Sequence, residues 1–405
     1  MPTQPITRIC FWWSIACKSI LPVFEAANQL PGVSCRVVCA RGVSPSRKKL
    51  GWTESELPDF PIEVLADQGW EGYVTRVVGE ESDSFHLLNS HYSIPKLNFA
   101  IDLLNARNIP YGLITESPIN MESGWRSLAK QVYVDYLLRF QRPEARRKAI
   151  ITYGLSGPSA SSMSAFERAG WKTNRVLPFG YFPARSPLGS ERTRSLNDVP
   201  WLFCSGVIER IKGHALLIDA LSGLAEEGLT DWKLHVTGYG RQRELLERLV
   251  NRRGLSKHIE FTGVLPVERY QALLADSDLV VAPGYREPWG IRVNEALLAG
   301  VPVVVSDGLG AACLVRESGA GLVFRSGSAS ELAASIRQAL TSAETRIEWK
   351  RRIEAYRHQI EPAAAARYLV DTLQQLAAGA SHGAISTSQP SSFALWARSV
   401  ESARP

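Results

Sequence analysis

The residues best suited to chemistry lie in a loop near position 290. Two carboxylates, Glu287 and Glu295, are eight positions apart, with the pair Trp289-Gly290 between them. The apolar spacing predicts a helix from about Gly290, so that Glu287 precedes the helix and Glu295 lies in its second turn. The N–H groups at a helix start bind anions such as phosphate, and carboxylates accept hydrogen bonds from hydroxyl groups. The alternative to a binding role is that Glu287 and Glu295 are two solvated carboxylates around a helix start.

A second loop follows the apolar run 201–204 and offers cations to a phosphate. Lys212 supplies a point charge. Arg210 has the planar fork that suits phosphate oxygens, with a surface side chain at a helix entrance as its alternative. Glycine turns at Gly206 and at 238–240 follow predicted strands, and such turns are weak evidence of function on their own.

The run from Pro283 to Ser306 resembles the retaining glycosyltransferases of family 4. Those enzymes have the GT-B fold, and their signature is a glutamate, an aromatic-glycine pair and a second glutamate eight positions after the first. The run from Phe203 to Leu217 resembles the phosphate-binding turn of the same family, and Lys212 matches its lysine. The resemblance extends from about Trp201 to Phe324. It implies the following donor-binding residues: Gly206, Arg210, Lys212, Gly238, Tyr239, Glu287, Trp289, Gly290, Ile291 and Glu295.

The resemblance also implies a role for each charged residue. Glu287 accepts hydrogen bonds from hydroxyls of the transferred sugar, and Glu295 accepts a pair from the ribose diol. Lys212 neutralises the diphosphate as it leaves. Val207 stands where the family has an arginine, so Arg210 is the candidate to supply that charge.

In the first half of the chain the resemblance is weaker. Glu116 follows the predicted strand 111–115 and stands where many family members place a histidine in the cleft. A carboxylate at the carboxyl end of a strand is suited to orient an acceptor hydroxyl. The alternative is that Glu116 has a structural role as an N-cap in the loop. His91 is a second candidate, with a structural histidine as the alternative. The expected catalytic residues are therefore Glu287, Lys212 and Glu116.

Two α/β domains are needed to position these residues. Strands are predicted at 201–204, 234–237, 259–262, 279–282 and 301–306, and helices at 214–225, 241–253, 267–275 and 291–299. The first half repeats the pattern with strands at 8–12, 35–40, 85–88, 111–115 and 149–153. We expect a GT-B architecture of two Rossmann-like, doubly wound parallel-sheet domains facing across a cleft. They comprise an acceptor domain at 1–180, a donor domain at 181–360, a helix at 361–378 that crosses back, and a disordered tail at 379–405.

Composition excludes several classes of protein. No apolar run approaches the ~20 residues that a membrane helix requires, and residues 1–9 do not read as a signal peptide, so we expect a cytoplasmic protein. The six cysteines lack paired CxxC spacing, which favours free thiols, and neither a metal nor a cofactor is expected. The basic amphipathic stretch 125–148 fits an anionic membrane surface or, alternatively, a core-facing helix with a solvated basic side.

The resemblance to family 4 implies a hexosyltransferase. It moves a sugar, with retention of configuration, from a UDP- or GDP-linked donor to a hydroxyl of a glycan or lipid-linked acceptor in polysaccharide biosynthesis. The chain lacks the GxxxxGK[ST], HExxH and GxSxG motifs, and nucleic acid is not an expected partner. A non-catalytic sugar-nucleotide-binding protein and a GT-B epimerase are the alternatives.

Overall fold

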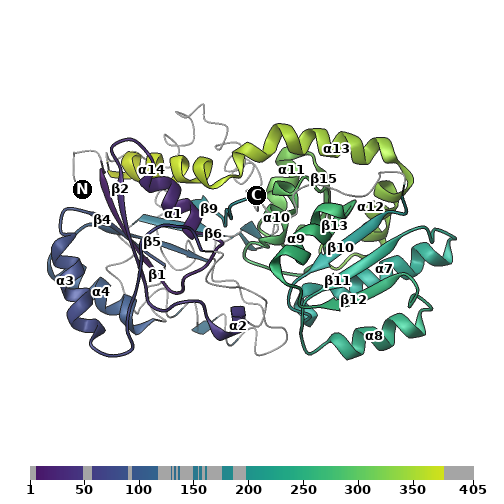
Figure 1. Cartoon of the computed structure of the whole chain (residues 1–405), viewed down its shortest axis with the longest axis horizontal. Coiled ribbons are helices and arrows are strands. Elements are labelled where there is room, and N and C mark those ends of the chain that lie inside the picture. The colour runs from purple at the N-terminus through teal and green to yellow at the C-terminus, as the bar shows by residue number, and fades with distance from the viewer. Residues whose placement is uncertain are drawn as a thin grey trace. The chain divides into compact units, whose positions relative to one another are not determined.

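The computed structural model describes residues 6–48, 57–89, 94–116, 149–153, 155–156, 160–161, 176–185 and 198–377, together with helical residues 129, 132, 133 and 136. The chain forms two compact units, each built on its own sheet (Figure 1). The first unit contains residues 1–44, 53–184 and 362–405, and the second contains residues 45–52 and 185–361. The first unit is therefore discontinuous in sequence.

The first unit contains a seven-stranded parallel sheet in the order β3-β2-β1-β4-β5-β6-β9. Its strands are β1 Arg8–Trp13, β2 Ser34–Cys39, β3 Ile62–Val64, β4 Phe85–Leu88, β5 Tyr111–Glu116, β6 Ala149–Tyr153 and β9 Val176–Phe179. The helices of this unit include α1 Leu21–Asn28, α3 Trp70–Glu80 and α4 Pro95–Ala106, and the short strands β7 Leu155–Ser156 and β8 Ala160–Ser161 form an antiparallel pair.

Strand β1 supplies side chains to both faces of this sheet. Phe11 stacks on Phe24 of α1 with 3.9 Å between ring centroids, and Trp13 meets the same ring edge-on at 5.3 Å. Trp12 lies on the opposite face because successive side chains of a strand alternate. Both tryptophans are buried, so the pair Trp12-Trp13 belongs to the core.

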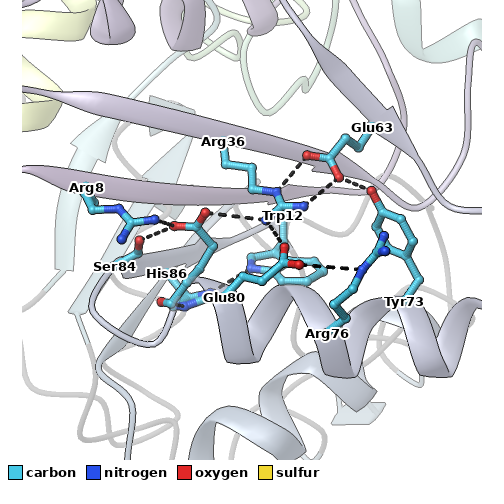
Figure 2. Close-up of polar contacts among 10 residues, drawn as sticks. Arg8, Trp12, Arg36, Glu63, Tyr73, Arg76, Glu80, Ser84 and His86 are labelled. Atoms are coloured by element: carbon cyan, nitrogen blue, oxygen red, sulfur yellow. Dashed lines mark hydrogen bonds and ion pairs between the residues drawn. The ribbon is translucent and has the colours of Figure 1, made fainter.

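On the Trp12 face, charged residues join the sheet to α3 (Figure 2). Arg36 of β2 binds both carboxylate oxygens of Glu63 at 2.7 and 3.0 Å and reaches Glu80 at 2.8 Å. Tyr73 also donates a hydrogen bond to Glu63, and Arg8 binds Glu81 at 2.9 Å. Opposite charges held against a buried sheet face require such pairing. The network therefore fixes the position of α3 on the sheet.

Trp12 also sets the protonation of a buried histidine. Its indole N–H donates to His86 Nδ1 at 2.9 Å, and an indole nitrogen cannot accept. The proton of neutral His86 therefore resides on Nε2, which donates to the Glu81 carbonyl at 3.0 Å. Burial lowers the pKa of His86 to about 4. His86 is thus an uncharged structural residue at neutral pH.

The second unit contains a six-stranded parallel sheet in the order β12-β11-β10-β13-β14-β15. Its strands are β10 Trp201–Ser205, β11 Lys233–Thr237, β12 Ile259–Gly263, β13 Leu279–Ala282, β14 Val303–Ser306 and β15 Gly321–Phe324. Its helices are α7 His214–Glu226, α8 Arg243–Arg252, α9 Val267–Asp276, α10 Arg292–Leu298, α11 Ala312–Ser318, α12 Ala329–Thr341 and α13 Ala343–Tyr356. The core of this unit is formed by apolar residues from helices, strands and loops, such as Leu217 of α7, Val304 of β14 and Trp232 before β11.

Helix α14, Pro362–Ala377, follows the second unit in sequence but belongs to the first, where it lies beside α1 (Figure 1). The ring of Tyr368 stacks on Phe179 with 6.2 Å between centroids, and its hydroxyl donates to the Pro178 carbonyl at 3.2 Å. Gln374 donates to the Ile6 carbonyl at 3.5 Å. Helix α14 therefore contacts residues near the start of the first unit, at Ile6, and residues of its last strand, at Pro178 and Phe179.

The predicted fold class, two α/β units with parallel sheets, is confirmed, and the predicted strands lie within two residues of those observed. The pattern does not predict β3, β9 and β15, nor the two-residue strands β7 and β8. Strand β3 has only three residues, β9 contains Pro178, which argues against a strand, and β15 begins at a glycine. None of the helices in the described ranges has the length and apolar content required to span a membrane.

Candidate active site

The second sheet reverses its strand order at β10. From β10 the chain moves outward to β11 and β12 and then returns to β13 on the other side of β10. Open α/β sheets bind ligands outside the carboxyl ends of their strands at such a switch point. The loops after β10 and β13 contain Lys212 and Glu287. The sequence-predicted donor residues of these two loops therefore lie where the topology favours a ligand.

Glycines allow the loops around the switch point to touch. A Cβ atom on Gly238 would lie 2.0 Å from the Gly206 carbonyl oxygen, and a Cβ atom on Gly213 would lie 2.1 Å from that of Pro283. All three of Gly206, Gly213 and Gly238 have positive φ angles, of 130°, 74° and 134°. Residues with a Cβ atom fit neither the contacts at Gly213 and Gly238 nor, without strain, these backbone angles. The turns after β10 and β11 and the start of α7 are thus packed backbone against backbone.

Glu287 is buried between two cations. Its Oε2 accepts a hydrogen bond from Lys212 Nζ at 2.6 Å, and its Oε1 accepts one from Arg292 Nη2. Arg292 also donates through Nη1 to the Ser205 carbonyl at 2.8 Å. Glu287 and Arg292 are 5% and 6% exposed, so both charges are removed from bulk water. We call Lys212, Glu287 and Arg292 the charged cluster.

Electrostatics keep the charged cluster ionised. Burial by itself would raise the pKa of Glu287, but the charges of Arg292 and Lys212 outweigh it and hold that pKa below its ordinary value. Burial would lower the pKa of Arg292, and the charge of Glu287 reverses this and raises it. Glu287 and Arg292 therefore both stay charged.

Glu295 lies in α10, the helix that begins at Arg292. Its Oε2 accepts a hydrogen bond from the Tyr270 hydroxyl at 2.9 Å, and that hydroxyl is 3.0 Å from Ser205 Oγ. Because the proton of Tyr270 points to Glu295, Ser205 acts as donor to Tyr270. Helix α10 begins at Arg292, not at Gly290, so Glu295 lies in its first turn and not in the second. The backbone at Gly290, with φ of 99°, is still outside the helix.

One predicted donor residue, Trp289, has a buried side chain. The side chain of Trp289 is 1% exposed and its N–H donates to Asn294 Oδ1 at 2.7 Å. The carbonyl of Trp289 accepts from Ala311 N at 2.9 Å. The Trp289 ring therefore anchors the loop to α10, and contact of this residue with a donor stays a prediction.

Three predicted donor residues outside the charged cluster are more accessible than Glu287. Tyr239 and Ile291 are partly exposed, and Arg210 is exposed on the 3-10 turn Arg210–Lys212. The Tyr239 carbonyl accepts from Ile208 N at 2.7 Å, which joins the two glycine turns. Contacts of these three side chains with a donor stay predictions.

Glu116 is the last residue of β5 in the first unit and is exposed. Its Oε1 accepts a hydrogen bond from the Tyr181 hydroxyl at 2.5 Å. The carboxylate is thus held at the carboxyl end of a parallel strand, as the sequence predicts. His91 and most of the basic stretch 125–148 lie outside the described residues.

The sequence interpretation missed Arg292, His214 and Tyr270. Arg292 carries a charge between the apolar residues Ile291 and Val293, and a charge in such a position signals a buried partner. His214 follows the Lys212-Gly213 pair directly and is 3% exposed. For Tyr270 we find no local signal, because its partners are 25 and 65 residues away. In the described part of the chain, no group of acidic, histidine or cysteine residues is arranged to hold a metal ion.

Comparison with known proteins identifies the second unit. Residues 190–356 match the family model described as glycosyl transferases group 1. The chain is 30% identical over 209 residues to 2-deoxystreptamine glucosyltransferase of Streptomyces kanamyceticus, covering 49% of this chain and 53% of that protein. It is 29% identical over 193 residues to lipopolysaccharide glucosyltransferase WaaG of Escherichia coli K12, covering 45% and 50%. The chain thus matches about half the length of these relatives.

The fold extends the likeness to nearly the whole chain. The crystal structure of Anabaena HepE in complex with UDP and glucose superimposes with a TM-score of 0.65 at 20% identity, covering 90% of this chain and 99% of HepE. At this identity the likeness concerns the fold alone. The chain therefore has the fold of the GT-B glycosyltransferases, and its residues 190–356 match the model of glycosyl transferases group 1.

Proposed function

We propose that the protein is a retaining glycosyltransferase of family 4. It moves a hexose from a UDP- or GDP-linked donor to a hydroxyl of a glycan or lipid-linked acceptor in polysaccharide biosynthesis. The observation that carries this proposal is the contact between Lys212 and Glu287 at the switch point of a glycosyltransferase group 1 domain, with Glu295 on the helix that follows.

The charges of the site suit departure of a nucleoside diphosphate. Lys212 stabilises the negative charge that develops on the leaving diphosphate, and its contact with Glu287 fixes the position of its ammonium group. Glu295, held by Tyr270, accepts hydrogen bonds from the ribose. Catalysis then depends on positioning, and the departing phosphate takes the proton of the acceptor hydroxyl. A pair of carboxylates flanking the bond, as in glycosidases, is not needed.

The relatives support a nucleotide-sugar donor. HepE has been crystallised with UDP and glucose, and the two curated relatives named above are glucosyltransferases. A UDP-linked hexose is therefore the first donor to test here.

The acceptor is proposed on the first unit. Glu116, at the end of β5, orients the acceptor hydroxyl. Within the basic stretch 125–148, the described residues Val132 and Tyr133 are 63% and 60% exposed. Apolar side chains among arginines and lysines are suited to an anionic membrane surface, from which a lipid-linked acceptor is reached. The protein would then act as a peripheral protein on the cytoplasmic face of the membrane.

A sugar-nucleotide panel tests the function. Wild-type protein is incubated with UDP-glucose, UDP-galactose and GDP-mannose, and release of the nucleoside diphosphate is measured beside binding. We expect one donor to be hydrolysed, and Lys212→Ala to abolish the activity. The matched control is Lys233→Ala, which removes an exposed lysine of the same unit that binds only the Lys257 carbonyl in the described contacts.

The outcomes separate the candidate functions. Binding without hydrolysis or transfer would indicate a non-catalytic binding protein, and conversion of the sugar while still attached to the nucleotide would indicate an epimerase. Absence of binding to every donor would contradict all three. The configuration of the product at the anomeric carbon, measured by NMR, tests retention.

A further inference from the structure

The guanidinium of Arg292 lies against the glycine turn after β10. Its Nη1 binds the Ser205 carbonyl at 2.8 Å, and a Cβ atom on Gly206 would lie 3.6 Å from Nη1 and 3.9 Å from Cζ. Arg292 begins helix α10, so its side chain reaches from the loop after β13 to the end of β10. It therefore spans the two loops that border the switch point.

Arg292 is a buried cation that shares the carboxylate of Glu287 with Lys212. Lys212, which is partly exposed, pairs with Oε2 of that carboxylate, so the buried cation Arg292 on Oε1 is not required for its neutralisation. Burying an additional cation is unfavourable unless an anion accompanies it. A bound anion next to Lys212 and Arg292 would balance the charges.

A buried histidine beside the charged cluster also lacks a partner. His214 is 3% exposed, and neither of its ring nitrogens has a hydrogen-bond partner among the described residues. The pKa of His214 is lowered to about 3, first by burial and then by the charges of Arg292 and Lys212. The imidazole is therefore neutral and offers one N–H donor. This N–H has no acceptor among the described residues.

We propose that Arg292 is a phosphate-binding residue of this site and, with Lys212, holds the diphosphate of a nucleotide. The inference rests on the proposed function, because it assigns a residue to the donor site proposed there. A guanidinium has five N–H groups in a planar fork, and the bonds to Ser205 and Glu287 leave others for phosphate oxygens.

Two other side chains of the region fit this task less well. Val207, next to Gly206, has no charge, and Arg210 is exposed on the turn before Lys212. Arg292 is the buried arginine whose position is fixed by two contacts at the switch point. Its charge thus reaches the β10 turn from a helix that begins more than eighty residues later.

The test compares UDP with uridine, which lacks the diphosphate. Calorimetric titration of Arg292→Gln should show a roughly tenfold to hundredfold loss of UDP affinity, with uridine affinity unchanged. Arg292→Lys keeps the charge that pairs with Glu287 and is expected to fold even where the glutamine variant does not. Its UDP affinity should fall several-fold, since ammonium lacks the fork.

Arg346→Gln is the matched control, because Arg346 is also buried and also donates to a backbone carbonyl, that of Ala339. We expect it to lower the melting temperature and to leave UDP affinity unchanged. Equal loss of UDP and uridine affinity in the folded Arg292 variants, or no loss of either, would overturn the assignment. If wild-type protein binds neither UDP nor GDP, the proposed function itself fails, and that result is distinct from failure of the Arg292 assignment.

Discussion

The hydroxyl of Tyr270 donates a hydrogen bond of 2.9 Å to the Glu295 carboxylate. Ser205, at the end of β10, is 3.0 Å from the same hydroxyl. Burial, followed by the charge of Glu295, raises the pKa of Tyr270 well above its ordinary value. Tyr270 therefore keeps its proton at neutral pH and remains a donor. These two hydrogen bonds, from Ser205 to Tyr270 and from Tyr270 to Glu295 Oε2, leave Oε1 of Glu295 to accept a hydrogen bond from a ligand.

Replacing Tyr270 by phenylalanine should disturb Glu295 without removing it. We expect Tyr270→Phe to lower the affinity for UDP and for uridine by the same factor, roughly threefold to tenfold, because both contain the ribose. Calorimetric titration with each ligand measures this. Tyr356→Phe is the control, since the buried hydroxyl of Tyr356 has no hydrogen-bond partner among the described residues. A change confined to UDP would show that Tyr270 acts on the phosphates instead.

Removal of Glu295 should have a larger effect of the same kind. Glu295→Ala is expected to weaken UDP and uridine alike by about tenfold to a hundredfold, since hydrogen bonds to a charged group contribute ~1.5–3 kcal/mol. The same titrations provide the measurement. Unchanged affinity for uridine would exclude the ribose as the partner of Glu295.

Glu287 should behave differently from Glu295. Because it pairs with Lys212 and Arg292, Glu287→Ala leaves two cations without their partner and should lower stability by about 3–5 kcal/mol. Glu287→Gln keeps the shape and is the informative variant. We expect UDP affinity to stay within about threefold of wild type while turnover falls by roughly a hundredfold, because the sugar is misplaced in the transition state.

The transfer assay with the identified donor, run beside UDP titration, decides the role of Glu287. Wild-type turnover in Glu287→Gln would show that this carboxylate only organises the two cations. A loss of UDP binding as large as that in Glu295→Ala would show that the two glutamates do not divide sugar from ribose.

The buried histidines should make the fold sensitive to mild acid. An unfolded histidine binds a proton near pH 6.5, whereas burial lowers the pKa of His86 to about 4 and of His214 to about 3. Above about pH 6.5 both histidines are neutral in the folded and in the unfolded protein, so the stability gained by burying them in the neutral form is fully present. It is lost as the pH falls toward the folded-state values, by ~1.4 kcal/mol per pH unit for each histidine.

Urea unfolding between pH 7.5 and pH 4.5 measures this dependence. His86→Gln retains an acceptor for Trp12 and a donor for the Glu81 carbonyl, so we expect a less stable first unit with a shallower dependence on pH. His358→Gln replaces an exposed histidine and should leave the dependence as in wild type. An unchanged slope in His86→Gln would contradict the assignment to His86.

Binding to anionic vesicles tests the membrane proposal. Sedimentation with vesicles that contain phosphatidylserine should deplete the protein at low salt and release it at high salt, since the attraction is screened within a Debye length. Vesicles of phosphatidylcholine alone are the control. We expect Tyr133→Ser, which removes an exposed ring, to weaken the binding. Absence of salt-sensitive sedimentation would remove the membrane surface from the proposal.

The sequence predicts the second unit well because its signals are local. Strands such as Leu279–Ala282 are short apolar runs, and the spacing of Glu287 and Glu295 is visible within one loop. The start of α10 is less well predicted: Gly290 is required for a backbone with positive φ and lies before the helix, which begins at Arg292. The position of a glycine in the sequence does not by itself tell whether it begins the helix or lies in the loop before it.

The partners of the site residues could not be predicted. Tyr270 reaches Ser205 and Glu295 through the packing of α9, and Arg292 reaches Ser205 across 87 residues of sequence. The Trp289 side chain is buried, and its N–H binds Asn294 of the following helix, which the sequence does not indicate. Such contacts depend on how loops of different strands meet at one edge of the sheet.

The return of α14 to the first unit has a consequence for synthesis of the protein on the ribosome. Residues 6–184 emerge first, but the helix that covers Phe179 and binds the Ile6 carbonyl emerges only after the second unit. Until then, apolar surface that Leu369 and Leu373 later help to bury stays uncovered. The second unit can fold during translation, whereas the first completes its core after it. Termination of translation before residue 362 would therefore damage the first unit, although the missing residues follow the second.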